Sequence, residues 1–397
     1  MNRRFFLKAA GAISGLGAGF RPGTVSALSS PHIYSELGIK PFINAAGTYT
    51  TLSGSVMADE VRKAMEQAGS AHVSIPELQA AVGKRIAEMV GAEGALVTAG
   101  CAAALTLATA ACIAGKDPEK IRRVPDTSGL KNEVICQKTH RVGYDHAIRN
   151  VGAKIIEVET RDQLMNAVSD RTAMFFFLNY SDPRGNIKRE EYAQIANRLG
   201  IPCLIDAAAD LPPIENLRAF TRIGFDLAAF SGGKGLCGPQ CSGLLIGKKQ
   251  LIEAAFLNGS PHSDSVGRVA KVGKEEIVGL YKALQLYLRR DQKAQWEDWE
   301  RRVSVIDREL GRVAGLKTER FVPVIANGSP HLRVQWNPQQ LPLTARQVVE
   351  RLRSGEPRIE LRPGSEEGKN MVEVSVWMLH PGEEKIVARR IRETFKT

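Results

Sequence analysis

Two ionisable side chains, Asp206 and Lys234, each stand at the end of a short apolar run. The run 202–205 leads directly into Asp206, and the run 225–230 leads into the sequence SGGK that ends at Lys234. Short apolar runs bounded by Gly, Pro and Asp are typical of buried strands, and the ends of such strands face a binding crevice in α/β sheets. We therefore expect one carboxylate and one amine, 28 residues apart, at the tips of neighbouring strands.

A carboxylate and an amine in this arrangement suit pyridoxal 5'-phosphate (PLP). The lysine amine can form an imine with the aldehyde of PLP, and the aspartate can keep the pyridine nitrogen protonated so that the ring accepts electrons. Taken alone, Lys234 could be a solvated loop residue or an anion contact, and Asp206 could be a helix N-cap. Ser231, three residues before the lysine, and the glycine-rich segment after it favour the cofactor interpretation.

A second pattern predicts where the phosphate of PLP would bind. The apolar run 95–98 is followed by Gly100, Cys101 and Ala102, which open a predicted helix of small residues. A strand, a glycine turn and a helix N-terminus together bring backbone N–H groups against a phosphate. A buried alanine-rich helix would show the same pattern, so this prediction depends on the presence of Asp206 and Lys234.

Four stretches of the chain resemble a known group of enzymes. They are INAAGTYTTLSGS (43–55), VTAGCAAA (97–104), FSGGKGLCGPQCSGLLIG (230–247) and GRVAKVGKEEIVGLYKAL (267–284). They are similar to the fold-type I PLP enzymes, and within these to the group of bacterial selenocysteine synthase (L-seryl-tRNA selenium transferase) and D-glucosaminate-6-phosphate ammonia-lyase. The resemblance runs from about Tyr34 to the C-terminus, and its last stretch leans towards the ammonia-lyase.

The resemblance implies further roles. In similar enzymes a hydroxyl group near the lysine also contacts the phosphate, and the residue at that place in this chain is Ser231. Fold-type I enzymes often stack a planar side chain on the pyridine ring just past a strand end, where this chain has His140 after the strand 134–136. His146 is expected on a helix over 144–151, without a direct role. The resemblance also implies a homodimer or a larger homo-oligomer.

Apolar runs and helical periodicity alternate along the middle of the chain. Regular alternation of strands and helices predicts a mostly parallel sheet with helices on both faces. Together with the resemblance, it gives an α/β fold class: a fold-type I large domain on a seven-stranded sheet and a small C-terminal α+β domain. The predicted strands of the sheet are 95–98, 134–136, 154–158, 172–178, 202–206, 225–230 and 241–247.

The predicted domains follow from these elements. The large domain with an N-terminal arm takes 28–260, a connecting segment takes 261–313, and the small domain takes 314–397. One long charged helix is expected from Lys274 to about Val313. In the small domain, strands are expected near 330–336, 358–361 and 371–377, and helices near 344–353 and 383–395.

Residues 1–27 resemble a twin-arginine export signal. Arg3 and Arg4 begin the sequence RRFFLK, a mild apolar stretch covers 9–20, and the small-residue sequence VSA at 25–27 suits cleavage. Such a signal is an address read by a receptor. We therefore expect the twin-arginine machinery as a partner, PLP loading in the cytoplasm, and a folded enzyme in the periplasm. A basic, frayed N-terminus with an incidental arginine pair is the alternative.

Composition excludes several classes of protein. Apolar content of 43% and charged content of 24% are those of a globular domain. The net charge of +11 includes four charges in the predicted signal, and the sequence shows no nucleic-acid motif, so no nucleic-acid partner is expected. No apolar run is long enough to anchor the chain in a membrane. Cys237 and Cys241 lack further ligands at zinc spacing, so no metal is expected.

These observations predict a PLP-dependent lyase. Once a substrate amino acid is bound, freed Lys234 is the natural base for its Cα proton. Loss of a β-leaving group then gives α,β-elimination, with dehydration and deamination of a small β-hydroxy amino acid or amino-sugar acid. Replacement and transamination share the first half of this chemistry. The alternatives are a transferase that acts on seryl-tRNA and a non-catalytic binding protein with the same fold.

The small substrate is expected to be anionic and amino-acid-like, so cations near the site are candidates for binding it. Arg268 and Arg358 are favoured because the matching stretches lie near and within the small domain, and Arg184 follows the most apolar strand. Arg141 and Lys271 are further candidates. Each of these residues could instead be a surface charge.

Overall fold

The computed structural model describes residues 33–364 and 370–396. The export signal predicted for residues 1–27 lies outside them. The chain divides into two units, 1–41 and 42–397, and the described part of the first holds the short helix α1 (Ile33–Glu36). In the described part of the chain, no helix is long and apolar enough to cross a bilayer, and no group of three or more His, Cys, Asp or Glu side chains could hold a metal ion.

The large domain is built on a seven-stranded sheet with the strand order β2-β8-β7-β6-β5-β3-β4. β8 runs antiparallel to both of its neighbours, and the other neighbouring strands pair parallel. The prediction of a mostly parallel seven-stranded sheet is therefore confirmed. The strands are β2 (Gly94–Thr98), β3 (Glu133–Gln137), β4 (Lys154–Val158), β5 (Thr172–Leu178), β6 (Cys203–Asp206), β7 (Leu227–Ser231) and β8 (Gly243–Gly247).

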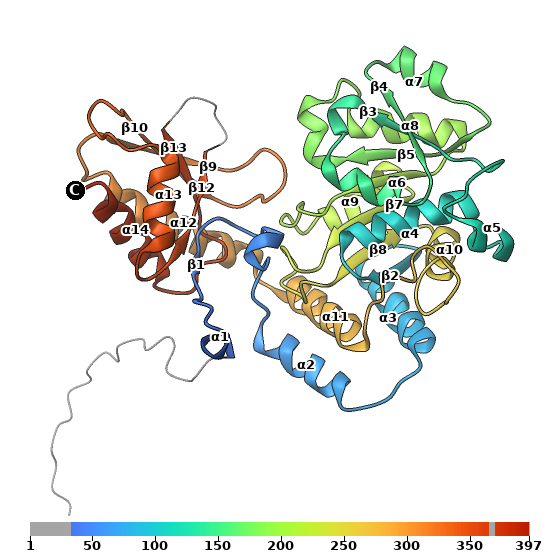
Figure 1. Cartoon of the computed structure of the whole chain (residues 1–397), viewed down its shortest axis with the longest axis horizontal. Helices are drawn as coiled ribbons and strands as arrows, with labels where there is room; N and C mark the ends of the chain where they lie inside the picture. The colour runs from blue at the N-terminus through green and yellow to red at the C-terminus, as the bar shows by residue number, and fades with distance from the viewer. Residues whose placement is uncertain (1–32, 365–369, 397) are drawn as a thin grey trace, which may run out of the picture. The chain divides into compact units, whose positions relative to one another are not determined.

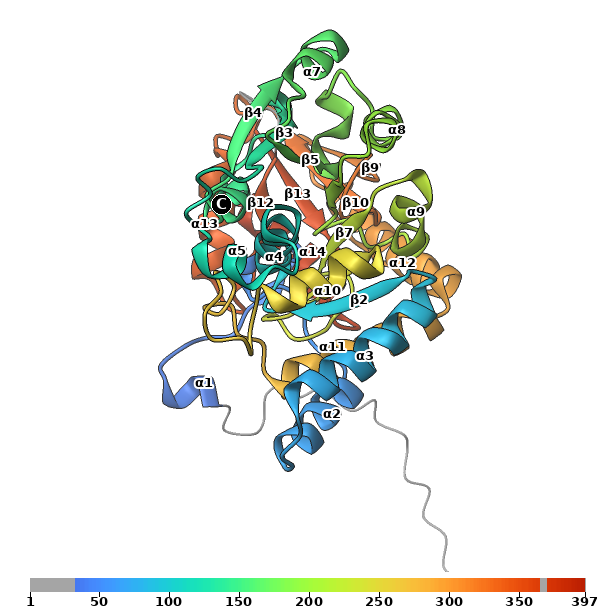
Figure 2. The ribbon, with the colours of Figure 1, turned by 90° about the vertical axis from the view of Figure 1, so that its right-hand side faces the viewer.

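Helices cover both faces of this sheet (Figures 1 and 2). Because successive side chains of a strand point to opposite faces, β5 sends Phe175 and Phe177 to one apolar cluster and Phe176 to the other. The first cluster packs under α3 (Ile75–Val90), α8 (Arg189–Leu199), α9 (Asn216–Ile223) and α11 (Lys274–Arg289). The second packs under α4 (Cys101–Ala114), α5 (Pro118–Arg123), α6 (His146–Arg149) and α10 (Lys249–Leu257). The large domain also contains α2 (Asp59–Gly69) and α7 (Arg161–Ala167).

The small domain has an antiparallel sheet, in the order β12-β13-β10-β9, with three helices on one face. Its strands alternate in polarity: Leu332 and Val334 of β10 point into the apolar core, whereas His331 and Arg333 point to the other face. The elements are α12 (Gln292–Leu310), β9 (Leu316–Phe321), β10 (His331–Trp336), α13 (Ala345–Ser354), β11 (Ile359–Glu360), β12 (Arg362–Pro363), β13 (Met371–Ser375) and α14 (Glu383–Thr394).

The structure corrects three expectations about these elements. The single long helix expected from Lys274 is two helices, because Arg290 is extended and the Asp291 side chain accepts a hydrogen bond from Ala294 N (3.0 Å) to begin α12. The strand expected near 358–361 is two short strands. The first of these, β11, pairs parallel with β1 (Ile43–Asn44), so a segment that was assigned to the large domain adds a strand to the small domain.

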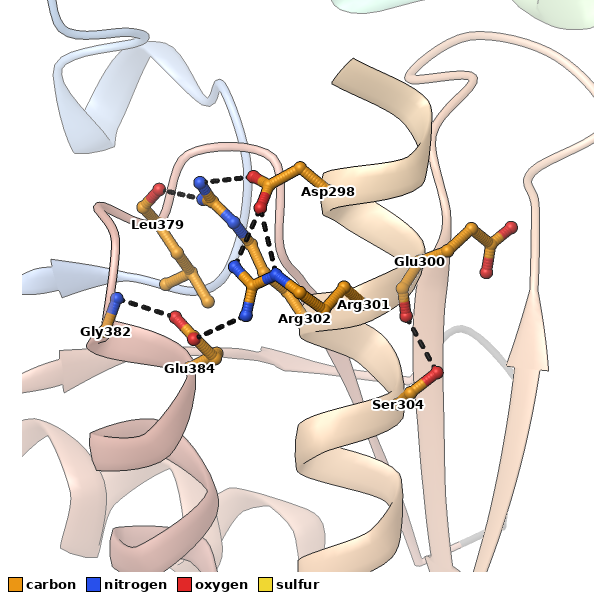
Figure 3. Close-up of polar contacts among 8 residues, drawn as sticks. All are labelled: Asp298, Glu300, Arg301, Arg302, Ser304, Leu379, Gly382 and Glu384. Atoms are coloured by element: carbon orange, nitrogen blue, oxygen red, sulfur yellow. Dashed lines mark hydrogen bonds and ion pairs between the residues drawn. The ribbon is translucent and has the colours of Figure 1, made fainter. Parts of the chain in front are cut away.

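An ion pair between Arg301 and Glu384 joins α12 to the start of α14 (Figure 3). Arg301 lies 2.7 Å from Asp298 and 3.1 Å from Glu384, which is 2% exposed. Burial alone would raise the pKa of Glu384, but hydrogen bonds from the backbone N–H groups of Glu384 and Gly382 and from Arg301 outweigh burial and lower the pKa. A carboxylate with a lowered pKa in the folded state stabilises the fold above its usual pKa and stops doing so as the pH falls through the folded-state value.

We predict that Glu384→Gln lowers the free energy of unfolding at pH 7 by about 1–3 kcal/mol, because it leaves Arg301 without its buried partner. The difference from wild type should shrink as the pH falls below about 4. Urea unfolding at both pH values measures it. Glu297→Gln removes an exposed carboxylate of α12 that lies 3.9 Å from Lys293 and is the matched control. Equal effects of the two substitutions would contradict the assignment.

Candidate functional site

Asp206 and Lys234 lie at the same edge of the large sheet. β6 and β7 are parallel neighbours, and Asp206 pairs in register with Ala229, five residues before Lys234. Asp206 is 5% exposed, and its Oδ1 accepts a hydrogen bond from Ala208 N (3.0 Å). The strand ends therefore bring the predicted carboxylate and amine to one edge of the sheet.

A closely packed turn holds Lys234. Gly232 N donates to Ser242 O (2.8 Å), and Cys237 N donates to Lys234 O (2.9 Å). A side chain at Gly233 or Gly235 would come within 2.5 Å or 2.1 Å of neighbouring backbone atoms, so the turn requires glycine on both sides of the lysine. Among the described residues, no hydrogen bond or ion pair of the Lys234 amine is found, although its charge acts on Asp206 and Asp210.

The N-terminus of α4 borders the carboxylate. Cys101, the first residue of α4, places its Sγ 3.7 Å from Asp206 Oδ1. Gly100 precedes the helix with a φ of +86°, and a side chain at Gly243 would come within 2.3 Å of the Gly100 backbone. Gly100, Cys101 and Ala102 therefore begin a helix beside Asp206, where the backbone N–H groups can receive an anion.

Burial dominates the electrostatics of this edge. Burial raises the pKa of Asp206, although the Ala208 N–H, the charge of Lys234 and the Cys101 thiol act in the opposite direction. Burial, followed by the charge of Asp206, also raises the pKa of Cys101 well above its usual value. A positively charged ring nitrogen beside Asp206 would stabilise its ionised form. Asp206, Lys234 and the start of α4 therefore fit the three parts of PLP: its ring nitrogen, aldehyde and phosphate.

The stacking predicted for His140 is wrong. The side chain is 0% exposed, its Nδ1 accepts a hydrogen bond from Leu178 N (3.1 Å), and its Nε2 lies 3.2 Å from Gln137 Nε2. The ring also makes an edge contact with Phe177. Burial lowers the pKa of His140 to about 4. His140 is a neutral core residue and has no exposed face for a cofactor ring.

Ser231 lies at the end of a strand and His146 lies on a helix, as expected. Ser231 ends β7, three residues before Lys234, and pairs with Gly243 of β8, so it lies at the edge of the sheet near the start of α4. His146 begins the short helix α6, and Arg149 lies 3.3 Å from it on the same helix.

The structure separates the candidate cations. Arg184 lines a cavity of about 330 Å³, where its Nη2 donates to Ser181 Oγ (2.7 Å). Arg358 and Arg268 do not line this cavity. Arg358 lies 2.7 Å from Glu360 and stacks over Phe42, and Arg268 is exposed in the loop after α10. Arg141 binds Asp145 (2.5 Å). Lys271 is exposed.

The cavity contains residues that sequence analysis missed. Arg362 lines it and lies over the ring of Tyr49, 4.7 Å from the ring centre. The detectable signal was the alternation of polar and apolar residues in HLRVQW and EVSVW, which assigns the polar residues to one face of the small sheet. The lining consists of Ala46, Gly47, Tyr49, Tyr180, Pro183, Arg184, Phe321, Pro323, Val324, Ile325, Ala326, Asn327, His331, Arg333, Arg362, Glu373, Ser375 and Trp377.

Hydrogen bonds connect the cavity to the lysine turn. Ser55, six residues after Tyr49, donates to Gly233 O through both its backbone N and its Oγ (3.0 Å each). Asn327 N donates to Ala209 O (2.8 Å), three residues after Asp206. Asp210 is another residue that sequence analysis missed: it is 3% exposed, and burial raises its pKa to about 6. These hydrogen bonds connect segments that line the cavity, or lie next to it, with the segments that follow Asp206 and carry Lys234.

Two known proteins are similar to this chain in sequence across both domains. It is 31% identical over 380 residues to D-glucosaminate-6-phosphate ammonia lyase of Salmonella typhimurium. The matched region covers 92% of this chain and 98% of that protein. It is 30% identical over 373 residues to 5'-C-glycyluridine monooxygenase-decarboxylase of a Streptomyces species, and the matched region covers 91% of each chain.

Solved structures share its fold. The structure of D-glucosaminate-6-phosphate ammonia-lyase matches with a TM-score of 0.80 and 29% identity, over 92% of this chain and 99% of that chain. A serine palmitoyltransferase with PLP matches with a TM-score of 0.57 and 13% identity, over 89% and 87% of the two chains. The fold-type I prediction is therefore confirmed.

A family model described as L-seryl-tRNA selenium transferase matches residues 42–298. These residues include the strand ends, the start of α4 and the turn that carries Lys234. The chain belongs to the SelA (L-seryl-tRNA selenium transferase) family.

Proposed function

We propose that the protein is a PLP-dependent lyase that releases ammonia from an anionic β-hydroxy amino acid or amino-sugar acid. The β-hydroxyl leaves as water, and one water is taken up when the dehydrated product is hydrolysed to a keto acid and ammonia. The observation that carries this proposal is the placement of Asp206 and Lys234 at adjacent strand ends, connected to a cavity that contains Arg362 and Arg184. The similarity to the ammonia lyase covers nearly the whole length of both chains, and so includes the small-domain residues beyond 298, where the family match ends.

When bound, PLP withdraws electrons from the substrate Cα and so makes its proton acidic. Lys234 would hold the cofactor through Nζ. The same Nζ, once free, would take the substrate Cα proton. Asp206 would hold the proton on the pyridine nitrogen, and the backbone N–H groups at Gly100, Cys101 and Ala102, with Ser231, would bind the phosphate.

Arg362 and Arg184 are suited to bind the anionic groups of the substrate. In the described part of the chain, neither forms an ion pair with a carboxylate. Arg333, the third arginine of the cavity, is largely neutralised because it lies 3.1 Å from Glu319 and 3.6 Å from Glu373. An arginine binds a carboxylate through two parallel N–H groups, which orients the substrate as well as attracting it.

Export through the twin-arginine route is part of the proposal, and the RRFFLK sequence of residues 3–8 supports it. Such signals are read by a receptor, so conservative replacement of both arginines should abolish export. We predict that the protein with Arg3→Lys and Arg4→Lys stays in the cytoplasm, whereas the wild type reaches the periplasm. Cell fractionation followed by immunoblotting measures this. Equal periplasmic amounts of both proteins would contradict export by this route.

Lys234→Ala should abolish covalent attachment of the cofactor. The purified wild type should absorb visible light in a band that borohydride removes, and the variant should lack that band. Ammonia release from D-glucosaminate, its 6-phosphate and both enantiomers of serine should fall by at least about 10²-fold for each compound turned over. Lys271→Ala, which replaces an exposed lysine, is the matched control. A wild type without bound cofactor, or one that releases no ammonia from any of these compounds, would overturn the proposal.

Arg362→Gln should raise the KM for the anionic substrate by about 10- to 100-fold with a smaller change in kcat, because it removes a charge-assisted hydrogen bond to a bound anion. Arg358→Gln is the control, since Arg358 is four residues earlier, pairs with Glu360 and does not line the cavity. Steady-state kinetics of ammonia release compares the two variants. A larger effect of Arg358→Gln than of Arg362→Gln would show that the wrong arginine had been assigned.

A further inference from the structure

One wall of the cavity is the loop between β9 and β10 (322–330), which we call the cavity loop. The residues of this loop that line the cavity are Pro323, Val324, Ile325, Ala326 and Asn327. Ala326 and Asn327 have φ values of +57° and +47°, in the left-handed region. This conformation costs free energy for residues other than glycine, so contacts with the rest of the structure must hold the loop in place.

These contacts come from residues 207–213, which follow the end of β6. Asn327 N donates a hydrogen bond to Ala209 O (2.8 Å). The two segments also approach closely at Gly328, where an added side-chain carbon would lie 3.1 Å from Pro212 O. The cavity loop of the small domain therefore packs on a segment of the large domain.

Asp210 belongs to this segment and is 3% exposed. Its carboxyl group accepts hydrogen bonds from the Ala326 N–H and from the side chain of Asn179. Asn179 follows β5, and its Oδ1 accepts from Arg189 Nη1 (3.1 Å), which leaves Nδ2 as the donor to Asp210. Asp210 therefore connects the cavity loop with the ends of both β5 and β6.

Asp210 is the titratable side chain of this contact. Residues 322–330 contain none, and residues 207–213 contain no other. Burial raises the pKa of Asp210 to about 6, and the charge of Asp206 acts in the same direction. The hydrogen bonds and the charge of Lys234 act in the opposite direction but do not outweigh burial.

Other ionisable groups border Asp210 or the cavity loop. Burial raises the pKa of Cys101, whose thiol stays neutral, and burial lowers the pKa of His331, which follows the loop and is neutral at pH 7. Asp206 and Lys234 also act on Asp210. Substitution of Asp210 itself is therefore the way to identify the group that titrates.

Docking of the cavity loop takes up a proton at Asp210. An exposed aspartate has a pKa of about 3.9, whereas Asp210 in the docked structure has a pKa of about 6. Because the pKa is higher in the docked state, docking is strongest below the exposed value and weakens as the pH rises through about 6. The equilibrium constant for docking should therefore fall about tenfold between pH 5 and pH 7.

We propose that Asp210 is a positioning residue: its carboxyl group holds the cavity loop against the large domain, and its protonation strengthens this wall of the cavity. The inference rests on the proposed function in taking the cavity as the place where the substrate binds. Docking of the loop itself does not require turnover. A wall that is docked in more of the molecules leaves the cavity formed in more of them, so KM should be lower at mildly acidic pH.

A spin label on the cavity loop measures docking directly. Val324 is 94% exposed, so Val324→Cys can carry the label outside the contact. In the PLP-loaded protein, the ratio of immobile to mobile label should fall about tenfold between pH 5 and pH 7. The same labelling of protein that keeps Val324 measures the signal from the native cysteines, which is subtracted.

Two substitutions separate the charge of Asp210 from its hydrogen bond. Asp210→Asn keeps an oxygen that accepts from the Ala326 N–H but cannot ionise, so the label should stay immobile at both pH values. Asp210→Ala removes the acceptor, and the label should be mobile at both. Glu215→Gln is the matched control, because Glu215 is an exposed carboxylate five residues further along the chain, and its label should respond to pH as in the wild type.

The ammonia assay connects docking with the substrate. For the compound that the wild type turns over fastest, KM should be at least about threefold higher at pH 7 than at pH 5. Asp210→Asn should lose most of this difference, whereas Glu215→Gln should keep it. If Asp210→Ala does not fold, Asp210→Asn and its control decide the result.

Three outcomes would overturn the inference: a label in the wild type that does not respond to pH, an equal response in Asp210→Asn, or a KM ratio that is the same in both proteins. Failure of the proposed function would look different. If the label responds to pH through Asp210, but no ammonia release depends on Lys234, the docking role of Asp210 stands and the lyase assignment fails.

Discussion

The site depends on a buried carboxylate held beside an amine at the ends of two paired strands. Burial of Asp206 disfavours its charge, and the groups that favour the charge come from three separate elements: the Ala208 N–H, the Cys101 thiol at the start of α4, and Lys234 after β7. A slip of one residue between β6 and β7 would turn every side chain of the slipped strand to the opposite face. The register of two strands therefore sets the chemistry, and the apolar clusters above and below the sheet fix that register.

In the small domain, too, successive side chains of each strand point to opposite faces of the sheet. One face of its sheet is apolar and packs on α12, α13 and α14, whereas the other presents His331, Arg333, Glu373 and Ser375 to the cavity. The three helices pack on the apolar face of this sheet, and the ion pair Arg301–Glu384 joins two of them, α12 and α14. The polar face can therefore be specialised for a ligand without loss of the core that supports it.

The parts predictable from the sequence were those fixed by local patterns. Apolar runs ending at Asp206 and before Lys234, and the glycine turn before α4, predicted the sheet and the meeting of these groups at one of its edges, because strand ends meet at one edge. The break between α11 and α12 also had a local signal, since Asp291 is a good N-cap residue. That signal was outweighed by the continuous charged pattern on both sides of it.

The remaining features depend on contacts between distant residues. His140 is enclosed by β5 and by Gly185, whose missing side chain leaves room for the ring, and sequence analysis cannot detect such an enclosure. Arg358 and Arg362 are four residues apart and chemically identical. Strand pairing alone assigns Arg358 to Glu360 and Arg362 to the cavity.

The pairing of β1 with β11 has a consequence for the order of folding. Ile43 and Asn44 pair with Ile359 and Glu360, so the segment that carries Gly47 and Tyr49 cannot take its final place until synthesis has passed residue 360. The large sheet, which uses residues 94–247, can form on the ribosome well before that point. The cavity residues of this segment and of the small sheet therefore come together only after the large sheet can already have formed.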